Sequence, residues 1–72
     1  MSITTREKEV LELASLGFNS KQIAHKIYIS PYTVNDHLRN LRIKMDASNV
    51  ALLVRRGFEY GLLTPHNTII NL

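Results

Sequence analysis

The longest helical repeat in this chain is the feature that most limits its fold. Val34, Leu38, Leu41 and Met45 recur at i, i+4, i+7 and i+11, which places four apolar side chains on one face of a single helix. The whole chain has 72 residues and no cysteine, so neither a disulfide nor a thiolate metal site can support its small core. Other helices must then cover this apolar face, and we expect an all-α domain built around residues 31–45.

Start and stop signals divide the rest of the chain into three further helices. Thr4 and Glu7 form a capping box ahead of a first helix over about residues 5–15, and Gly17 is placed to end it. Asn19 or Ser20 can cap a short second helix that contains "KQIAHKI", and Ser30 and Pro31 mark the start of the third helix. A fourth helix runs from about Asn49 to Tyr60, with Ser48 or Asn49 as its cap and Gly61 as its stop.

The second and third predicted helices, joined by a tight turn, have the pattern of a helix-turn-helix unit, whose second helix enters the major groove of DNA. The small residue Ala24 allows the two helices to approach closely, and Ile29 and Val34 can fill the space between them. Any hairpin of two helices in a small bundle needs similar residues. The spacing alone therefore leaves a purely structural hairpin open.

Polar side chains on the third helix favour the DNA-binding alternative. Asn35, Arg39 and Arg42 fall at i, i+4 and i+7, and we expect them to form a stripe facing away from the core. Asparagine pairs well with adenine and arginine with guanine, although a solvated helix face is the plainer interpretation. Lys21, in the first turn of the second helix, either anchors a phosphate or only adds solubility. The hydroxyls of Tyr32 and Thr33 can donate hydrogen bonds to a phosphate, although Thr33 can equally only reinforce the helix cap.

Composition restricts the other functional classes. The net charge of +3 and the pI near 9.6 give a mild preference for polyanions. No segment approaches the roughly 20 apolar residues that span a bilayer, and no signal peptide is recognisable, so we expect a cytoplasmic protein at the bacterial nucleoid without a membrane partner. His25, His37 and His66 lack metal-ligand spacing, and no catalytic constellation is found. We expect neither enzymatic activity, nor a metal, nor a cofactor.

Several motifs in register resemble the LuxR/GerE/FixJ family of bacterial transcription factors over about residues 3–63. "TTREKEVL" is similar to the family's opening Leu-Thr-x-Arg-Glu-x-Glu-Val-Leu, and "GFNSKQIA" to its Gly-x-Ser-Asn-Lys-Glu-Ile-Ala. "ISPYTVNDH" resembles Ile-Ser-x-x-Thr-Val-Lys-x-His, and Lys44-Met45 stands at the family's Lys-Leu. The resemblance implies a LuxR C-terminal-like domain over residues 1–63, followed by a tail over residues 64–72 that is either frayed or docked.

The resemblance also implies roles for individual positions. The third helix would read the major groove with Asn35, Asp36 and Arg39, and Asp36 is close enough in sequence to orient Arg39 and Asn40. The fourth helix would form a two-fold dimer contact, so we expect a homodimer on an inverted repeat in double-stranded DNA. By the resemblance, the backbone-facing candidates are Lys21, Thr33, His37, Asn40 and Lys44, and the helix positions themselves add Tyr32 and Arg42. The dimer candidates, which lie close to one face of the fourth helix and which core packing alone could also use, are Val50, Leu53, Val54 and Gly57.

Three departures from the family pattern keep a second function open. Asn35 replaces the usual Lys, Asp46-Ala47 replaces Gly-Val, and Val50 replaces a common Arg. Asp36 and the missing Lys lower the positive potential of the reading helix, which suits an antagonist that captures a full-length relative in a heterodimer through the fourth helix. Contact with RNA polymerase, and the choice between a stand-alone regulator and an excised domain, stay open as well.

Overall fold

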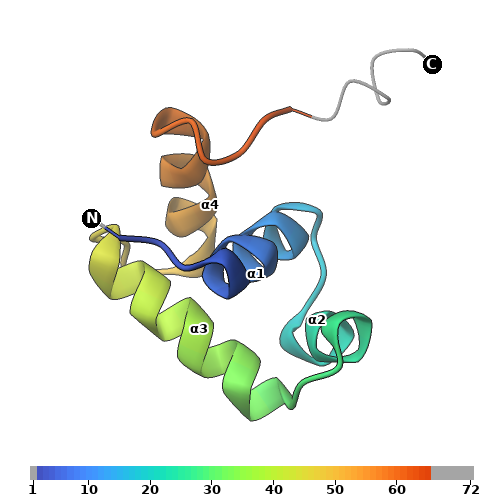
Figure 1. The fold of residues 1–72 in the computed structure, drawn as a ribbon. Helices are drawn as coiled ribbons and strands as arrows, with labels where there is room; N and C mark the ends of the chain where they lie inside the picture. The colour runs from blue at the N-terminus through green and yellow to red at the C-terminus, as the bar shows by residue number, and fades with distance from the viewer. Residues whose placement is uncertain (1, 66–72) are drawn as a thin grey trace, which may run out of the picture.

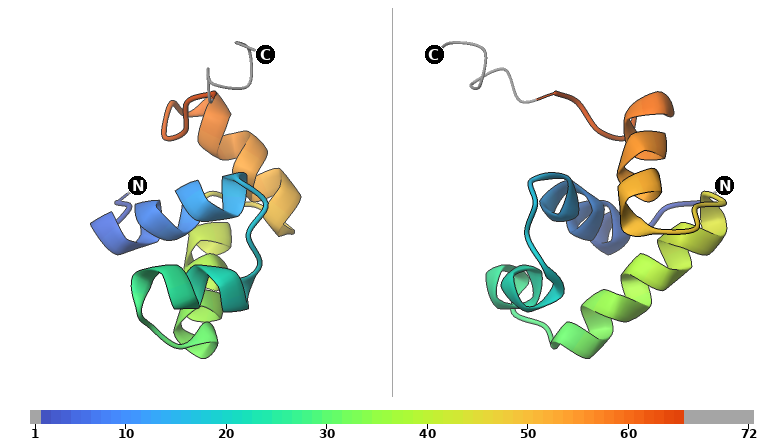
Figure 2. Two further views of the ribbon diagram at one scale, coloured as in Figure 1. Left: turned by 90° about the vertical axis from the view of Figure 1, so that its right-hand side faces the viewer. Right: turned by 180° about the vertical axis from the view of Figure 1, so that it is seen from behind.

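The computed structural model describes residues 2–65, which form four α-helices and no strand (Figure 1). The third helix packs against each of the other three, and the two views in Figure 2 show the first helix crossing it. The predicted all-α class is confirmed, as are the ranges of the first, third and fourth helices to within one residue. The helices are α1 (Thr5–Ser15), α2 (Ser20–Ile27), α3 (Pro31–Lys44) and α4 (Val50–Glu59).

Each helix begins at a polar residue that the sequence marks as a cap. Thr4 Oγ1 accepts from the Glu7 N–H at 3.0 Å, and the Glu7 carboxylate accepts from the Thr4 N–H at 2.9 Å, which completes the predicted capping box. Gly17 and Gly61 follow α1 and α4 with φ of 92° and 76°, the left-handed conformation that glycine adopts without strain. The other caps are Asn19 for α2, Ser30 for α3 and Asn49 for α4.

The turn between α2 and α3 contains a feature that the sequence does not signal. Tyr28 ends α2 in the left-handed conformation, with φ of 60° and ψ of 44°, although it is not a glycine. This conformation costs a residue with a side chain roughly 1 kcal/mol. The next residue, Ile29, donates its N–H to the Ala24 carbonyl at 3.0 Å and packs against the core. Tyr28 therefore accepts local strain so that the chain turns sharply into α3.

The core follows the apolar stripe of α3. Val34, Leu41 and Met45 are almost completely buried, and Leu38 is nearly so, as the periodicity predicts. Ala24 is also buried, in agreement with a close approach of α2 to α3. Burying one such aliphatic side chain is worth about 1.5–3 kcal/mol. The residues that complete this core from the other elements are Val10, Leu11, Ile23, Ala47, Leu53 and Leu63.

One face of α4 belongs to the same core. Leu53 is fully buried, and Gly57 is buried because the chain folds back after the helix and brings Leu63 over it. The N–H groups of Leu62 and Leu63 both donate to the Gly57 carbonyl, at 2.8 and 3.1 Å. A Cβ atom added to Gly57 would lie 2.6 Å from Leu63 Cδ1. Leu53 and Gly57 are therefore used inside the protomer, which is the core-packing alternative that the sequence left open for these two dimer candidates.

Candidate nucleic-acid interface

The side of α3 opposite its buried face presents four side chains at i, i+4, i+7 and i+11. We call Tyr32, Asp36, Arg39 and Ile43 the outward stripe, since the 3.6-residue repeat places them about opposite Leu41 and Met45. Tyr32 and Ile43 are 76% and 72% exposed. The stripe thus combines a hydroxyl, an acid, a base and an apolar group on one accessible helix face.

The two charged members of the outward stripe form an ion pair. Arg39 Nη2 lies 3.0 Å from Asp36 Oδ1, and the side chains are 64% and 40% exposed. The expectation that Asp36 orients Arg39 agrees with this geometry. Pairs of this kind at i and i+3 of a helix contribute only a few tenths of a kcal/mol to stability. The pair therefore affects the shape and charge of this surface more than the stability of the fold.

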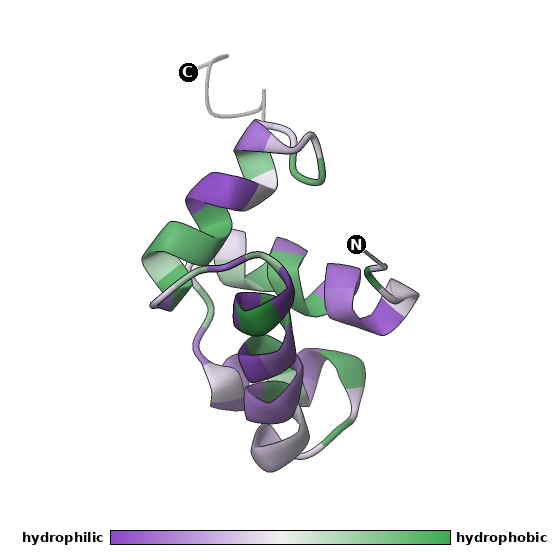
Figure 3. Cartoon of the chain, turned by 90° about the vertical axis from the view of Figure 1, so that its left-hand side faces the viewer, coloured by the Kyte–Doolittle hydropathy of each residue, from purple (hydrophilic) through white to green (hydrophobic). Residues whose placement is uncertain are grey.

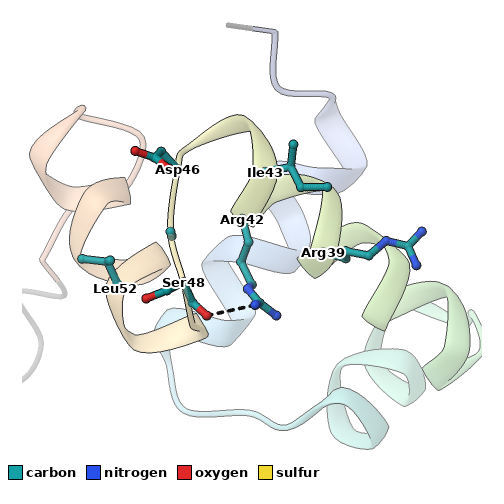
Figure 4. A pocket seen from close by; sticks show the side chains of 7 residues that line it. Arg39, Arg42, Ile43, Asp46, Ser48 and Leu52 are labelled. Carbon is teal, nitrogen blue, oxygen red and sulfur yellow. Dashed lines mark hydrogen bonds between the residues drawn. The ribbon is translucent and has the colours of Figure 1, made fainter.

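Asn35 and Arg42 lie beside the outward stripe rather than on it. Asn35 Oδ1 accepts from the Ser20 hydroxyl of α2 at 2.5 Å. The half-buried Arg42 turns toward the loop before α4 and donates Nη2 to the Ser48 carbonyl at 2.9 Å, whereas Arg39 extends away from that loop (Figure 4). Of the predicted stripe of Asn35, Arg39 and Arg42, the structure thus places Arg39 on the outward stripe, with the exposed Asn35 and the half-buried Arg42 beside it, each hydrogen-bonded to a neighbouring element.

A hollow of about 440 Å³ separates the C-terminal half of α3 from the start of α4 (Figure 4). Arg42 lines it, and the buried Nε atom of this residue has no hydrogen-bond partner within residues 2–65. Ile43 and Leu52 give the hollow apolar walls, and Asp46 adds an acid. Its mixed lining and open shape provide no defined binding chemistry beyond the arginine.

The remaining backbone-facing candidates lie on α2 and along α3. Lys21 is exposed in the first turn of α2, beside a hollow that it shares with His25 and Lys26. Thr33 is half-buried, and its hydroxyl lies 2.9 Å from the Ser30 hydroxyl, so it takes part in the cap. This arrangement fits the plainer alternative for Thr33. Of the other two candidates, Asn40 is exposed and His37 is half-buried.

Lys44 is tied to α1. Its Nζ atom lies 2.7 Å from Glu7 Oε1, and the Glu7 side chain is only 4% exposed. Burial raises the pKa of Glu7, but the hydrogen bond from Lys44, the hydrogen bonds from the Thr4 N–H and hydroxyl, and the Lys44 charge together lower it below the ordinary 4.5. The carboxylate is thus held ionised inside the fold. The sequence-based assignment of Lys44 to the DNA backbone did not anticipate this ion pair with Glu7 inside the protein.

The flank of α4 beside its core face carries partly exposed apolar side chains. Val50 is 38% exposed and Phe58 is 40% exposed, and the half-buried Val54 lies between them at i+4. Figure 3 shows hydrophobic bands along α4, whereas α3 is coloured mainly hydrophilic. Of the four predicted dimer residues, Val50 and Val54 are accessible. Phe58 and Ile43 were not among the predicted site residues, although the helical period places Ile43 opposite the buried face of α3.

Among residues 2–65, the His, Asp and Glu side chains form no group of three that could hold a metal ion. The helices described for this part of the chain are also too short or too polar to cross a membrane.

Comparison with known proteins identifies related regulators. The chain is 39% identical over 62 residues to the transcriptional activator protein EsaR of Pantoea stewartii subsp. stewartii, covering 86% of this chain and 25% of that protein. It is 36% identical to the transcriptional regulatory protein FixJ of Bradyrhizobium diazoefficiens, covering 86% of this chain and 30% of that protein. The chain thus spans about a quarter to a third of the length of these curated relatives, which are transcriptional regulators.

The fold has a close counterpart among solved structures. The transcription factor GerE superposes with a TM-score of 0.82 at 28% identity, and the match covers 89% of this chain and 97% of that one. A family model described as bacterial regulatory proteins, luxR family, matches residues 1–56. The chain therefore belongs to the luxR family of bacterial regulatory proteins, and its four helices form a DNA-binding helix-turn-helix domain of that family.

Proposed function

We propose that this protein regulates transcription by binding a specific site in double-stranded DNA, with α3 in the major groove. The outward stripe carries the proposal, because it presents hydrogen-bonding groups on a face of α3 that no other described element covers. An α-helix fits the major groove, where each base pair shows its own pattern of donors and acceptors. With DNA as its ligand, we expect the protein in the bacterial cytoplasm, at the nucleoid.

Base contacts fall to Asn35, Asp36 and Arg39 in this proposal. Because the Asn35 carbonyl oxygen already accepts from Ser20, its amide N–H₂ group is the part that can donate to a base. Arg39 can donate to guanine from the nitrogens that do not contact Asp36. The residues that we assign to the DNA backbone are Lys21, Tyr32, Thr33, His37, Asn40 and Arg42, with Lys44 limited by its ion pair to Glu7.

We also propose a homodimer on an inverted repeat, with α4 as the contact. Val50, Val54 and Phe58 occur at successive i+4 positions, so two such helices can bury their apolar faces against each other. The surface is small, since Leu53 and Gly57 are used inside the protomer. A small contact suits a dimer that forms on DNA, where two-fold symmetry sets half-sites about one helical turn apart.

A salt titration with three alanine variants tests the DNA proposal. If a dimer makes about 6–10 phosphate contacts, binding should weaken roughly 10³- to 10⁵-fold between 50 and 200 mM salt. Arg39→Ala should relax base preference at one position of each half-site, whereas Lys21→Ala should weaken binding to all sequences alike. Lys8→Ala removes an exposed cation from α1 and is the matched control. Affinity that does not change with salt would exclude this function.

The dimer needs its own measurement, namely the number of protomers bound per duplex by analytical ultracentrifugation. The wild type should bind a selected inverted repeat as two protomers, and Phe58→Glu should bind it as one. Tyr60→Glu, which changes another exposed aromatic residue at the end of α4, is the control and should keep two. A Phe58→Glu variant that still binds as two protomers would place the dimer contact elsewhere.

The alternative, an antagonist that captures a related regulator through α4, is favoured by one observation. The Asp36 carboxylate pairs with Arg39 and reduces the positive charge of the outward stripe. Selection from a random duplex library separates the two functions, because an antagonist should retain little DNA and enrich no motif. An enriched motif with two half-sites would support the DNA-binding homodimer instead.

A further inference from the structure

We infer that Asp36 and Arg39 read two neighbouring base pairs as one unit: Arg39 donates to a guanine, and Asp36 accepts from the amino group of a cytosine or adenine. The inference rests on the proposed function, since it assigns bases to the helix that this function places in the major groove. It adds the chemical class of base that must stand beside the guanine.

The geometry of the ion pair leaves both partners able to bind bases. Arg39 contacts Asp36 through Nη2, and a guanidinium has five N–H groups, so Nε and Nη1 can still donate. Asp36 contacts Arg39 through Oδ1, and within residues 2–65 its second oxygen, Oδ2, takes part in no hydrogen bond or ion pair. The side chains are 64% and 40% exposed on the outward stripe. Each group is therefore held by the other while part of it faces outward.

The spacing fits adjacent base pairs. Side chains at i and i+3 of a helix start about 5–6 Å apart, and successive bases along one strand are about 3.4 Å apart. Asp36 and Arg39 lie in the N-terminal two-thirds of α3, the part of a recognition helix that approaches base edges most closely. A bridging carboxylate and guanidinium at this separation would engage neighbouring pairs more readily than the two bases of one pair.

The chemistry of the groove then decides which bases Asp36 accepts. Cytosine offers its N4 amino group and adenine its N6 amino group, and each can donate to the carboxylate. Guanine presents O6 and N7, and thymine presents O4, so these bases place an acceptor against an anion that has lost part of its water. Asp36 would therefore select by rejection, which also lowers affinity for non-specific DNA.

A purely stabilising role explains this pair less well. Exposed ion pairs contribute little to folding, and α1 contains a comparable pair between Arg6 and Glu9, at 3.6 Å with both side chains 43% exposed. That pair has the same i, i+3 spacing but lies away from the outward stripe. Removing Glu9 changes the net charge by the same amount as removing Asp36. Glu9→Ala is thus a matched control for the electrostatic effect alone.

The test is selection from a random duplex library with the wild type, Asp36→Ala, Asp36→Asn and Glu9→Ala. Affinities are then measured for the selected duplex and for three duplexes that carry each of the other bases at the position beside the guanine. The wild type and Glu9→Ala should favour cytosine or adenine there by roughly 5- to 150-fold over guanine or thymine. Asp36→Ala should bind all four nearly equally. Asp36→Asn should bind duplexes with guanine or thymine at this position more tightly than the wild type does, because its amide group can also donate a hydrogen bond.

The outcomes separate this inference from the proposed function. If Asp36→Ala selects the same motif as the wild type and binds every duplex more tightly, Asp36 is only an electrostatic penalty and the inference is overturned, while DNA binding stands. A wild type that enriches no motif would overturn both. Circular dichroism confirms that each variant is folded, and the isosteric Asp36→Asn decides the matter if Asp36→Ala does not fold.

Discussion

Replacing Lys44 by Met tests the contact that joins α1 to the last turn of α3. The change keeps most of the side chain's apolar length but removes the ammonium that lies 2.7 Å from Glu7 Oε1. Leaving a fully buried charge without its partner costs about 3–5 kcal/mol. Here the Thr4 N–H still donates to Glu7, and Lys44 is 33% exposed, so water can replace part of the contact. We therefore expect Lys44→Met to lower the free energy of unfolding by about 1–3 kcal/mol at pH 7.

The loss should depend on pH in a defined direction. The pKa of Glu7 is lower in the folded protein than its ordinary 4.5, so the ion pair stabilises the fold above that pH and loses its effect as the pH falls further. For a domain of this size, 1 kcal/mol corresponds to a melting temperature change of about 4–8 °C. Thermal unfolding followed by circular dichroism should show a large difference between wild type and Lys44→Met at pH 7 and a smaller one near pH 3.

A difference that stays constant from pH 7 to pH 3 would refute this reasoning, because it would show that ionised Glu7 does not carry the effect. Lys8→Met is the control, since its exposed side chain should contribute less than about 0.5 kcal/mol. The same variant bears on DNA binding. If Lys44 also contacts a phosphate, Lys44→Met should reduce the slope of log affinity against log salt by about one per protomer.

Three further substitutions probe the backbone and the packing of the fold, and thermal or urea unfolding measures each of them. Gly57→Ala should lower the free energy of unfolding by up to about 2 kcal/mol, because the cost of overpacking against Leu63 exceeds the gain in helix propensity of about 1 kcal/mol. If the same substitution costs as much in a Leu63→Ala background, overpacking against Leu63 is not the cause. Tyr28→Gly should stabilise by about 0.5–1 kcal/mol by relieving the left-handed conformation; destabilisation would mean that the 92% exposed ring has a contact of its own. Asn49→Ala should cost about 1 kcal/mol by removing the α4 cap, and no change would show that water replaces it.

Local signals explain why so much of the fold could be predicted. The Thr4 capping box and the Ser30-Pro31 start depend on side chains within three residues of the backbone groups that they satisfy. The apolar repeat of α3 likewise needs only the helical period to identify its buried face. Tyr28 shows the limit of such signals, because a left-handed tyrosine is set by the packing of Ile29 and not by its own preference.

The site was harder to predict, because contacts distant in sequence decide which side chains are accessible. Glu7 and Lys44 are 37 residues apart, and no pattern within either helix reveals their ion pair. Arg42 is drawn toward the loop before α4 by the Ser48 carbonyl. The sequence of α4 alone allows Gly57 to face a partner helix, but Leu63, in the segment after α4, packs over it. Composition and spacing therefore identified the helix that we propose as the reading helix, and tertiary contacts determined which of its side chains are accessible.

The charge on α3 gives the proposed dimer a physical reason. An acid on the outward stripe lowers attraction to phosphates for every sequence, and the net charge of +3 leaves each protomer with modest non-specific affinity. The same acid raises discrimination wherever it meets an amino group of a base. In the proposed complex, one protomer would have selectivity but little affinity, and a second protomer on an inverted repeat would add its binding energy without weakening that selectivity. An Asp36→Ala variant that binds a single half-site more tightly, yet distinguishes inverted repeats from random DNA less well, is the expected signature of this balance.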